Sequence, residues 1–147
     1  MKNKIEISAV FPASVEMLYT AWLSSRGHSA LTGAKAEVDH RIGGKFTAWD
    51  GYISGTTVEL ENFKRIVQKW RTTDFPEGSP DSRLEVRFEE VKGGTEITLV
   101  HTGLPDGTED EYLKGWKDYY FKPMKKYLAK HGKEKWEKAF KIPGTGE

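Results

Sequence analysis

Hydrophobic and polar residues alternate along most of this chain, and the period of the alternation changes with position. Residues 5–11 alternate with a period of two, with Ile5, Ile7 and Ala9 on one side, which predicts a first β-strand. The same period returns between residues 34 and 103 and predicts six further strands. These cover residues 34–39, 43–49, 52–60, 64–73, 82–91 and 95–103.

Two glycine-containing turns indicate how these strands are connected. Asp50-Gly51 and Gly93-Gly94 each separate two strand-like runs, and both pairs suit a tight hairpin turn that needs positive φ angles. Sequential hairpins produce a mostly antiparallel sheet, so one face should be buried while the other meets water.

A period near 3.6 follows Pro12 and predicts a short helix, for which Ser14 is a suitable N-cap. A second short helix is expected over residues 24–31, ending near Gly33. The core-facing stripe of the first helix consists of Val15, Leu18, Tyr19, Trp22 and Leu23.

The longest helical pattern lies near the C-terminus and predicts a helix over residues 108–130. Thr108 and Glu111 have the spacing of a capping box, in which Glu111 reaches back to the start of the helix. Pro123 lies inside this helix and has no N–H for the Tyr119 carbonyl, so we expect a kink of more than about 20° there.

This order of elements predicts an α+β fold. The chain provides one strand, two short helices, six strands and one long helix, so a curved, antiparallel, seven-stranded sheet should grip the C-terminal helix. A cavity is expected where the sheet bends away from that helix. We predict a single domain over residues 1–141 and a disordered tail over residues 142–147.

Composition excludes several classes of function. The 147 residues include no cysteine, which rules out disulfides, thiolate metal sites and cysteine nucleophiles. No apolar run approaches the roughly 18 residues of a membrane span, so we expect a cytoplasmic protein that does not bind a membrane. The four histidines are scattered without metal-ligand spacing, and no phosphate-binding glycine loop occurs, so neither a metal nor another cofactor is expected.

Charge is distributed unevenly around a net value of +1. Residues 1–113 carry thirteen Lys/Arg and eighteen Asp/Glu, whereas residues 114–141 carry ten lysines and three acidic residues. The basic segment is either the solvated face of an amphipathic helix or a surface for an acidic partner. The acidic strands do not form a basic platform for nucleic acid, and we expect none to bind.

His101 and a surplus of Trp and Tyr are the candidate functional features. His101 is in phase with Ile97 and Leu99, so it should point to the buried face, where a polar group needs a partner. Three roles are open for His101: a core histidine bonded to a tyrosine hydroxyl, a group that orients a ligand, or an acid–base catalyst. The other three histidines are expected at the surface. The aromatic residues suit either a core or the opening of a pocket. They are Trp49, Tyr52, Trp70, Tyr112, Trp116, Tyr119 and Tyr120.

Five segments, in this order along the chain, carry a resemblance to a known family: ASVEMLYTAW (13–22), RIGGKFTAWDGYISG (41–55), KRIVQKWR (64–71), LVHTGLP (99–105) and GWKDYY (115–120). Over roughly residues 3–130 the chain resembles the family called activator of heat-shock protein 90 ATPase homologue-like, within the START-like (SRPBCC, helix-grip) superfamily. The resemblance implies a helix gripped by a curved sheet, in agreement with the hydrophobic pattern.

The resemblance also implies three kinds of function. Eukaryotic co-chaperones of this name have two domains, and the chain resembles the C-terminal one. Many single-domain relatives are presumed binders of small apolar molecules, and some START-like relatives are cyclases or dehydratases. Because the sequence shows no evident buried acid–base pair, we expect a non-enzymatic protein that binds a small apolar or aromatic molecule. The alternatives are a protein partner of a heat-shock protein 90 type chaperone and an enzyme acting on an aromatic or polyketide-like substrate.

The ligand is expected in a cavity between the sheet and the C-terminal helix. We expect His101 and Trp116 to border this cavity together, between residues 97–101 and 112–124. The sheet wall would consist of Phe46, Ile53, Trp70, Val86, Phe88 and Leu99. The helix would contribute Tyr112, Trp116, Tyr120 and Met124, with polar contacts from His101 and Tyr119.

Overall fold

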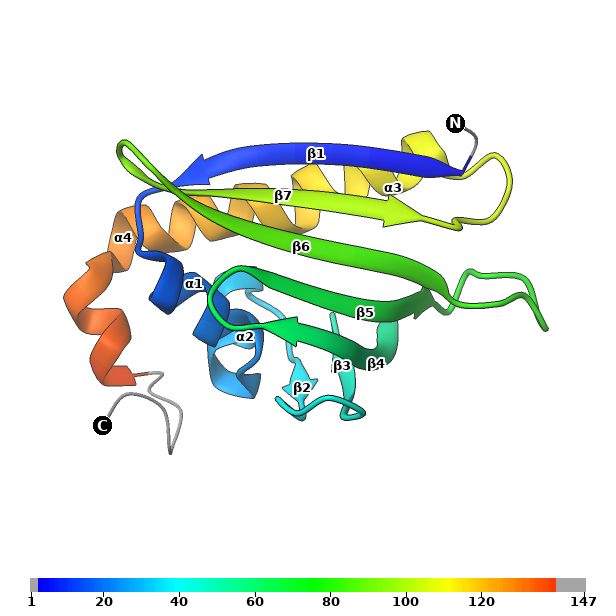
Figure 1. The fold of residues 1–147 in the computed structure, drawn as a ribbon, viewed down its shortest axis with the longest axis horizontal. Helices are drawn as coiled ribbons and strands as arrows, with labels where there is room; N and C mark the ends of the chain where they lie inside the picture. Colours follow the sequence, from blue (N-terminus) through cyan, green and yellow to red (C-terminus); the bar gives the residue numbers. More distant parts are fainter. Residues whose placement is uncertain (1–2, 140–147) are drawn as a thin grey trace.

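The computed structural model describes the backbone of residues 3–139 and the side chains of residues 3–130. Seven strands form one antiparallel sheet in the order β1-β7-β6-β5-β4-β3-β2, which curves over a long helix (Figure 1). This confirms the predicted α+β, helix-grip architecture. The strands are β1 (Lys4–Phe11), β2 (Glu37–Val38), β3 (Lys45–Ala48), β4 (Ile53–Glu61), β5 (Arg65–Thr72), β6 (Ser82–Val91) and β7 (Gly94–Thr102).

The hairpin turns lie where the sequence predicts them. The φ angles are positive at Asp50 and Gly51 (57° and 91°) and at Gly93 and Gly94 (93° and 144°). In the first turn the left-handed conformation extends back to Trp49, whose φ is 51°, a value that is rare for a bulky side chain. The strand predicted over residues 34–39 is shorter than expected, because only the two residues of β2 pair with β3.

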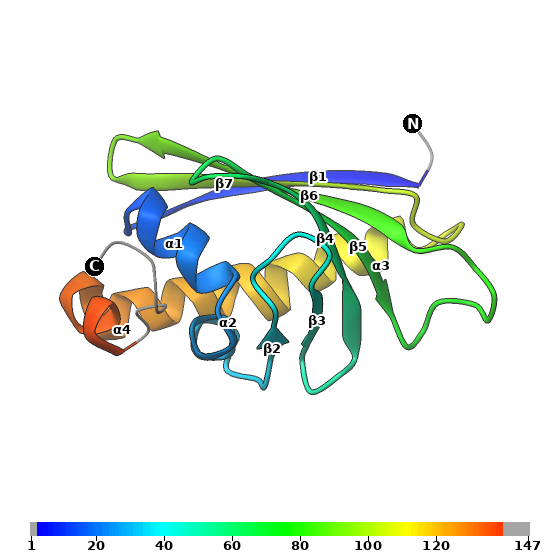
Figure 2. The same ribbon diagram turned by 60° about the horizontal axis from the view of Figure 1, so that its bottom comes forward.

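Two short helices follow β1, as predicted: α1 (Val15–Trp22) and α2 (Ser25–Thr32). Ser14 and Ser24 cap them, since each hydroxyl accepts a hydrogen bond from a backbone N–H three residues further on. Gly33 ends α2 in the left-handed conformation. Both helices lie on the same face of the sheet as the long helix (Figure 2).

The C-terminal helical run is continuous but irregular. It consists of α3 (Glu109–Trp116), the π-helical turn η1 (Lys117–Phe121) and α4 (Lys122–Ala139), and so extends beyond the predicted end at residue 130. The helical run keeps one direction from α3 through η1 into the first part of α4, past Pro123, and only the C-terminal part of α4 turns away (Figures 1 and 2). The irregularity imposed by Pro123 is therefore a wider turn just before the proline instead of the predicted kink, since a wider turn accommodates both the ring and the missing N–H.

The predicted capping box at the start of α3 is not formed. The Thr108 hydroxyl donates to the Pro105 carbonyl at 2.6 Å and makes no hydrogen bond to the first turn of the helix. Glu111 instead lines the pocket described below.

The core lies between the inner face of the sheet and the helices. Fully burying an aliphatic side chain stabilises a fold by roughly 1.5–3 kcal/mol, so this layer fixes the long helix over the sheet. The fully buried residues of the sheet include Ile66, Val86, Ile97 and Leu99, and the helical run adds Trp116, Tyr120 and Met124, each no more than 3% exposed.

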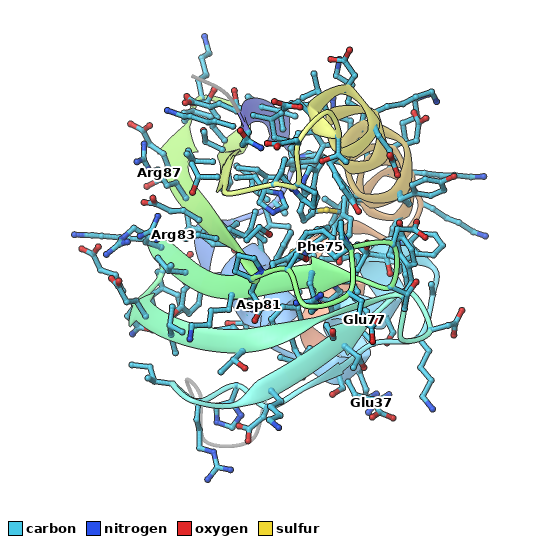
Figure 3. The ribbon with its side chains drawn as sticks, turned by 90° about the vertical axis from the view of Figure 1, so that its right-hand side faces the viewer. Glu37, Phe75, Glu77, Asp81, Arg83 and Arg87 are labelled. Atoms are coloured by element: carbon cyan, nitrogen blue, oxygen red, sulfur yellow. The ribbon has the colours of Figure 1, made fainter. Side chains whose placement is uncertain are left out.

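The outer face of the sheet carries a charge network centred on Glu85. Arg65, Arg83 and Arg87 approach its carboxylate at 3.6, 3.4 and 2.9 Å. Burial opposes ionisation of Glu85, but the hydrogen bond and charge of Arg87 outweigh it and lower the pKa of this carboxyl group. Arg83 and Arg87 point away from the helix, whereas Phe75 lies on the helix side of the sheet (Figure 3).

Two further predictions concern the chain as a whole. None of the helices in the described part of the chain combines the length and the apolar run that spanning a bilayer requires. The predicted domain end at residue 141 and the tail over residues 142–147 lie outside the described residues.

Candidate ligand pocket

A pocket of about 590 Å³ lies between the sheet and the helical run, on the side of β3, β4 and β5. Its volume falls within the roughly 300–1,000 Å³ that small-molecule sites occupy. The sheet side contributes Trp49, Tyr52, Ile53, Trp70 and Asp74. The helical side contributes Glu111, Tyr112, Lys114, Gly115, Trp116, Asp118, Tyr119 and Tyr120.

Trp49, in the turn between β3 and β4, ties the sheet to the helix at this pocket. Its indole N–H donates to the Tyr119 carbonyl at 3.2 Å, and its ring meets the Tyr119 ring edge to face at 5.3 Å between centroids. In an α-helical turn this carbonyl would accept the N–H of residue 123, which Pro123 does not have. The left-handed backbone of Trp49 is strained, and such strain concentrates at functional sites.

Trp70 and Trp116 form the buried base of the pocket, and each is 3% exposed. The Trp116 Nε1–H donates to Nδ1 of His101 at 3.1 Å, and Nε2–H of His101 donates to Ser82 Oγ at 2.8 Å. The Ser82 hydroxyl in turn donates to the Trp70 carbonyl at 2.7 Å. The Trp116 indole can only donate, so Nδ1 of His101 must accept, and the Ser82 proton is used on the Trp70 carbonyl, so Nε2 must donate. We therefore assign His101 as the neutral Nε2–H tautomer. Burial lowers the pKa of His101 to about 3.

A second buried histidine, His28, holds Tyr120. Nδ1–H of His28 donates to the Trp22 carbonyl at 2.9 Å, so its Nε2 accepts a hydrogen bond from the Tyr120 hydroxyl at 2.7 Å. Burial lowers the pKa of His28 to about 4 and raises that of Tyr120. The expected surface position of His28 is therefore wrong, since the side chain is 4% exposed. The histidine hydrogen-bonded to a helix tyrosine is His28, whereas His101 is hydrogen-bonded to Ser82 and Trp116.

The remaining polar groups of the pocket include two tyrosine hydroxyls. Tyr52 donates to Oδ2 of Asp74 at 2.8 Å, and the hydroxyls of Tyr112 and Thr72 share a hydrogen bond of 2.7 Å. Burial raises the pKa of Tyr52 and of Tyr112. Both hydroxyls are therefore neutral donors or acceptors at ordinary pH.

Charged side chains surround the opening. Asp118 is paired with Lys114 and, at 3.1 Å, with Lys122. The hydrogen bonds from these two lysines lower the pKa of Asp118. Within residues 3–130, neither Asp74 nor Glu111 has a cationic side chain at ion-pair distance, and no three His, Asp or Glu side chains are grouped closely enough to hold a metal ion.

Comparison with known proteins assigns this chain to a family. The family described as Activator of Hsp90 ATPase homolog 1-like protein matches residues 12–129. The chain belongs to this family. The matched region includes every residue that lines the pocket, and the assignment confirms the resemblance carried by the five sequence segments.

Curated members of the family are longer than this chain. The human activator of 90 kDa heat shock protein ATPase homolog 1 is 34% identical over 122 residues, which are 83% of this chain and 36% of the human protein. The mouse activator homolog 2 is 30% identical over 124 residues, which are 84% of this chain and 37% of the mouse protein. The chain thus spans little more than a third of the length of these relatives.

Solved structures with this fold include family members. An HSP90 activator from Plasmodium falciparum superposes with a TM-score of 0.77 and 28% identity, over 86% of this chain and 96% of that protein. CalU16 from Micromonospora echinospora superposes with a TM-score of 0.71 over 92% of this chain and 82% of that protein. At 23% identity, the second similarity is one of fold alone.

The structure brings half of the twelve predicted ligand-binding residues to the pocket: Ile53, Trp70, Tyr112, Trp116, Tyr119 and Tyr120. The other six are buried but do not line it: Phe46, Val86, Phe88, Leu99, His101 and Met124. Thus His101 and Trp116 do not border one cavity as expected. His101 lies behind Trp116, and the region expected to be open between residues 97–101 and the helix is filled by the Trp70, His101 and Trp116 rings.

Packing explains why two of these six residues do not line the pocket. The Phe46 ring covers Gly55, where a Cβ atom would lie 2.8 Å from ring carbons. The Phe88 ring packs edge to face against Tyr19 of α1, with 5.6 Å between centroids. Both side chains therefore belong to the core.

The sequence patterns did not single out the charged residues of the pocket. Asp74, Lys114 and Asp118 carry no pattern that separates them from ordinary surface charge, and Glu111 was assigned to a capping box instead. Trp49 and Tyr52 were noted as surplus aromatic residues, and their place beside the Asp50-Gly51 turn was the signal that could have placed them at an opening.

Proposed function

We propose that this protein binds a small apolar or aromatic molecule in the pocket, without catalysing its conversion. The observation that carries the proposal is a pocket of about 590 Å³ whose lining includes seven aromatic residues. Rigid aromatic side chains provide a large contact area, and the pocket has the size of sites that bind small molecules.

The two buried histidines support binding rather than catalysis. Both ring nitrogens of His101 are engaged by Trp116 and Ser82, and both ring nitrogens of His28 are engaged by Tyr120 and Trp22. A general base needs a free lone pair within reach of the substrate and a pKa near the working pH. Neither histidine lines the pocket, and burial holds their pKa values at about 3 and 4.

Gly115 offers a direct test of the pocket. It lines the pocket from α3, and a Cβ atom placed there would have a Tyr119 ring carbon, 4.0 Å away, as its near neighbour. A larger side chain at this position would therefore extend into the pocket. We expect Gly115→Phe to abolish ligand binding while the protein stays folded. Gly115→Ala is the matched control, because it adds one carbon and should stabilise the helix by about 0.5–1 kcal/mol.

Two measurements read out this pair of variants. Native mass spectrometry of protein purified from its own host should show a retained small molecule on the parent and on Gly115→Ala, but none on Gly115→Phe. A panel of aromatic and apolar compounds should raise the Tm of the first two proteins only. A compound that still binds Gly115→Phe must bind outside the pocket. Loss of binding in both variants would indicate that the helix is disturbed, not that the pocket is filled.

A second candidate function is suggested by the family. Its curated members are named as activators of the 90 kDa heat shock protein ATPase, so a chaperone of this type is a candidate partner. The surface that would serve it is the lysine-rich face of the helical run or the rim of the sheet. Binding of the purified chaperone and stimulation of its ATPase test this candidate, with the lysine variants described in the Discussion.

A further inference from the structure

We propose that the occupant of the pocket is an organic cation, namely an amine or quaternary ammonium group carried on an apolar or aromatic body. This proposal rests on the proposed function, since it names the ligand class for the same pocket. Two properties of the lining carry it: the direction of the aromatic polar atoms and the balance of charge at the opening.

Most of the aromatic residues that line the pocket have their polar atom engaged by other protein groups, which leaves ring atoms to contact a ligand. Five of the seven use their polar atom in a hydrogen bond to another protein group, and four of those bonds go to residues outside the lining or to backbone. The faces of aromatic rings carry partial negative charge and attract a cation within about 6 Å of the ring centre. The five residues are Trp49, Tyr52, Tyr112, Trp116 and Tyr120.

The charges at the opening favour the same ligand. Asp74, Glu111 and Asp118 line the pocket together with a single cation, Lys114. Lys114 is held by Asp118, which also binds Lys122. Asp74 and Glu111 are therefore left without a cationic partner in the described part of the chain. A cationic ligand would supply that partner, whereas an anion would face two carboxylates without a cationic partner.

Three probes of one shape and different charge test the proposal. Benzyltrimethylammonium is the cation, neopentylbenzene is its neutral carbon isostere, and phenylmethanesulfonate is a tetrahedral anion of similar size. Binding is followed through the indole N–H signals of Trp49, Trp70 and Trp116 in nitrogen–proton correlation spectra. We expect the cation to bind about ten-fold more tightly than the neutral probe, and the anion more weakly than both.

Charge-neutral variants then test the carboxylates. Asp74→Asn and Glu111→Gln keep the shape of the side chains, and each should weaken binding of the cation several-fold while binding of neopentylbenzene stays the same. Glu77→Gln is the matched control, because Glu77 is an exposed acid outside the pocket lining. Raising the salt concentration should weaken binding of the cation but not of the neutral probe.

The outcomes separate the ligand class from the pocket itself. If the neutral probe binds as tightly as the cation, or if the Asp74→Asn, Glu111→Gln double variant still prefers the cation, the cationic ligand is overturned and the pocket stands. If none of the three probes shifts the three indole signals, while parent and Gly115→Phe also behave alike with the compound panel, the proposed function falls as well.

Discussion

At the scale of single residues, two buried neutral histidines position the walls of the pocket. His101 holds Trp116 through Nδ1, and His28 holds Tyr120 through Nε2. A proton added to His101 would place a second donor opposite the Trp116 N–H, and one added to His28 would displace the Tyr120 hydroxyl as donor. The shape of the pocket therefore depends on both rings staying neutral.

This dependence predicts a loss of stability in mild acid. The pKa values of His28 and His101 in the folded protein are about 4 and about 3, below the value of about 6.5 expected for an unfolded chain. The unfolded state therefore binds more protons below pH 6.5. Stability from these groups is complete above that pH and falls as pH decreases towards 4 and 3. At pH 5.0 each histidine should cost about 2 kcal/mol relative to pH 7.5.

Urea unfolding at the two pH values measures this effect. His28→Gln and His101→Gln should each lose about 2 kcal/mol less than the parent between pH 7.5 and 5.0, even though each variant is less stable at pH 7.5. The exposed His40 provides the control, since His40→Gln should retain the full dependence. An unchanged pH dependence in both buried variants would contradict the neutral assignments.

The sequence reveals part of this arrangement. The phase of His101 with Ile97 and Leu99 predicted its burial, because alternation within a strand is local. Its partners were not predictable, since Ser82 and Trp116 reach it from other elements. His28 was missed because α2 is short and mostly polar, although Leu31 and Thr32 follow it at the i+3 and i+4 spacing of a buried helical face.

At the scale of elements, the turn between β3 and β4 and the turn η1 form one unit. Pro123 removes a helical N–H, and the Trp49 indole supplies a donor to the Tyr119 carbonyl instead. The missing N–H was predictable from sequence alone. Its replacement was not, because Trp49 is seventy residues away and reaches the helix from a strained left-handed backbone.

A double-mutant cycle tests this unit. Trp49→Phe keeps an aromatic ring but removes the N–H, and it should destabilise the protein by about 1 kcal/mol. Pro123→Ala restores a backbone N–H, which in an α-helical turn donates to the Tyr119 carbonyl. In that background the cost of Trp49→Phe should fall, so that urea unfolding yields a coupling of about 0.5–1 kcal/mol. Equal costs in both backgrounds would mean that Trp49 and Pro123 act independently.

At the scale of the whole molecule, the fold was more predictable than the pocket. Strand alternation, turn glycines and helical stripes are local signals, and they predicted seven strands around one long helix. The place of the pocket depends on how far the sheet curves and on how Trp70, His101 and Trp116 fill the space beneath β7. These are properties of packing between distant segments, so the pocket lies beside β3, β4 and β5 and not where the sequence suggested.

The uneven charge of the chain yields a last prediction, which concerns the chaperone candidate. The exposed lysines of the helical run include Lys114, Lys117, Lys125 and Lys130. Their described contacts are a surface ion pair with Asp118 and the approach of Lys125 to the Phe11 ring at 5.9 Å. Such contacts contribute little to stability. Replacing all four with Gln should therefore leave the Tm within roughly 5 °C of the parent.

The same variant decides whether this surface serves a protein partner. Its matched control replaces four exposed lysines of the sheet side with Gln, so that both variants lose the same charge: Lys45, Lys64, Lys69 and Lys92. If a heat-shock protein 90 type chaperone binds the parent and the sheet variant but not the helix variant, the basic helical face is the partner surface. Loss in the sheet variant alone would assign the rim of the sheet instead. Equal binding by all three proteins would exclude charge recognition by either set of lysines.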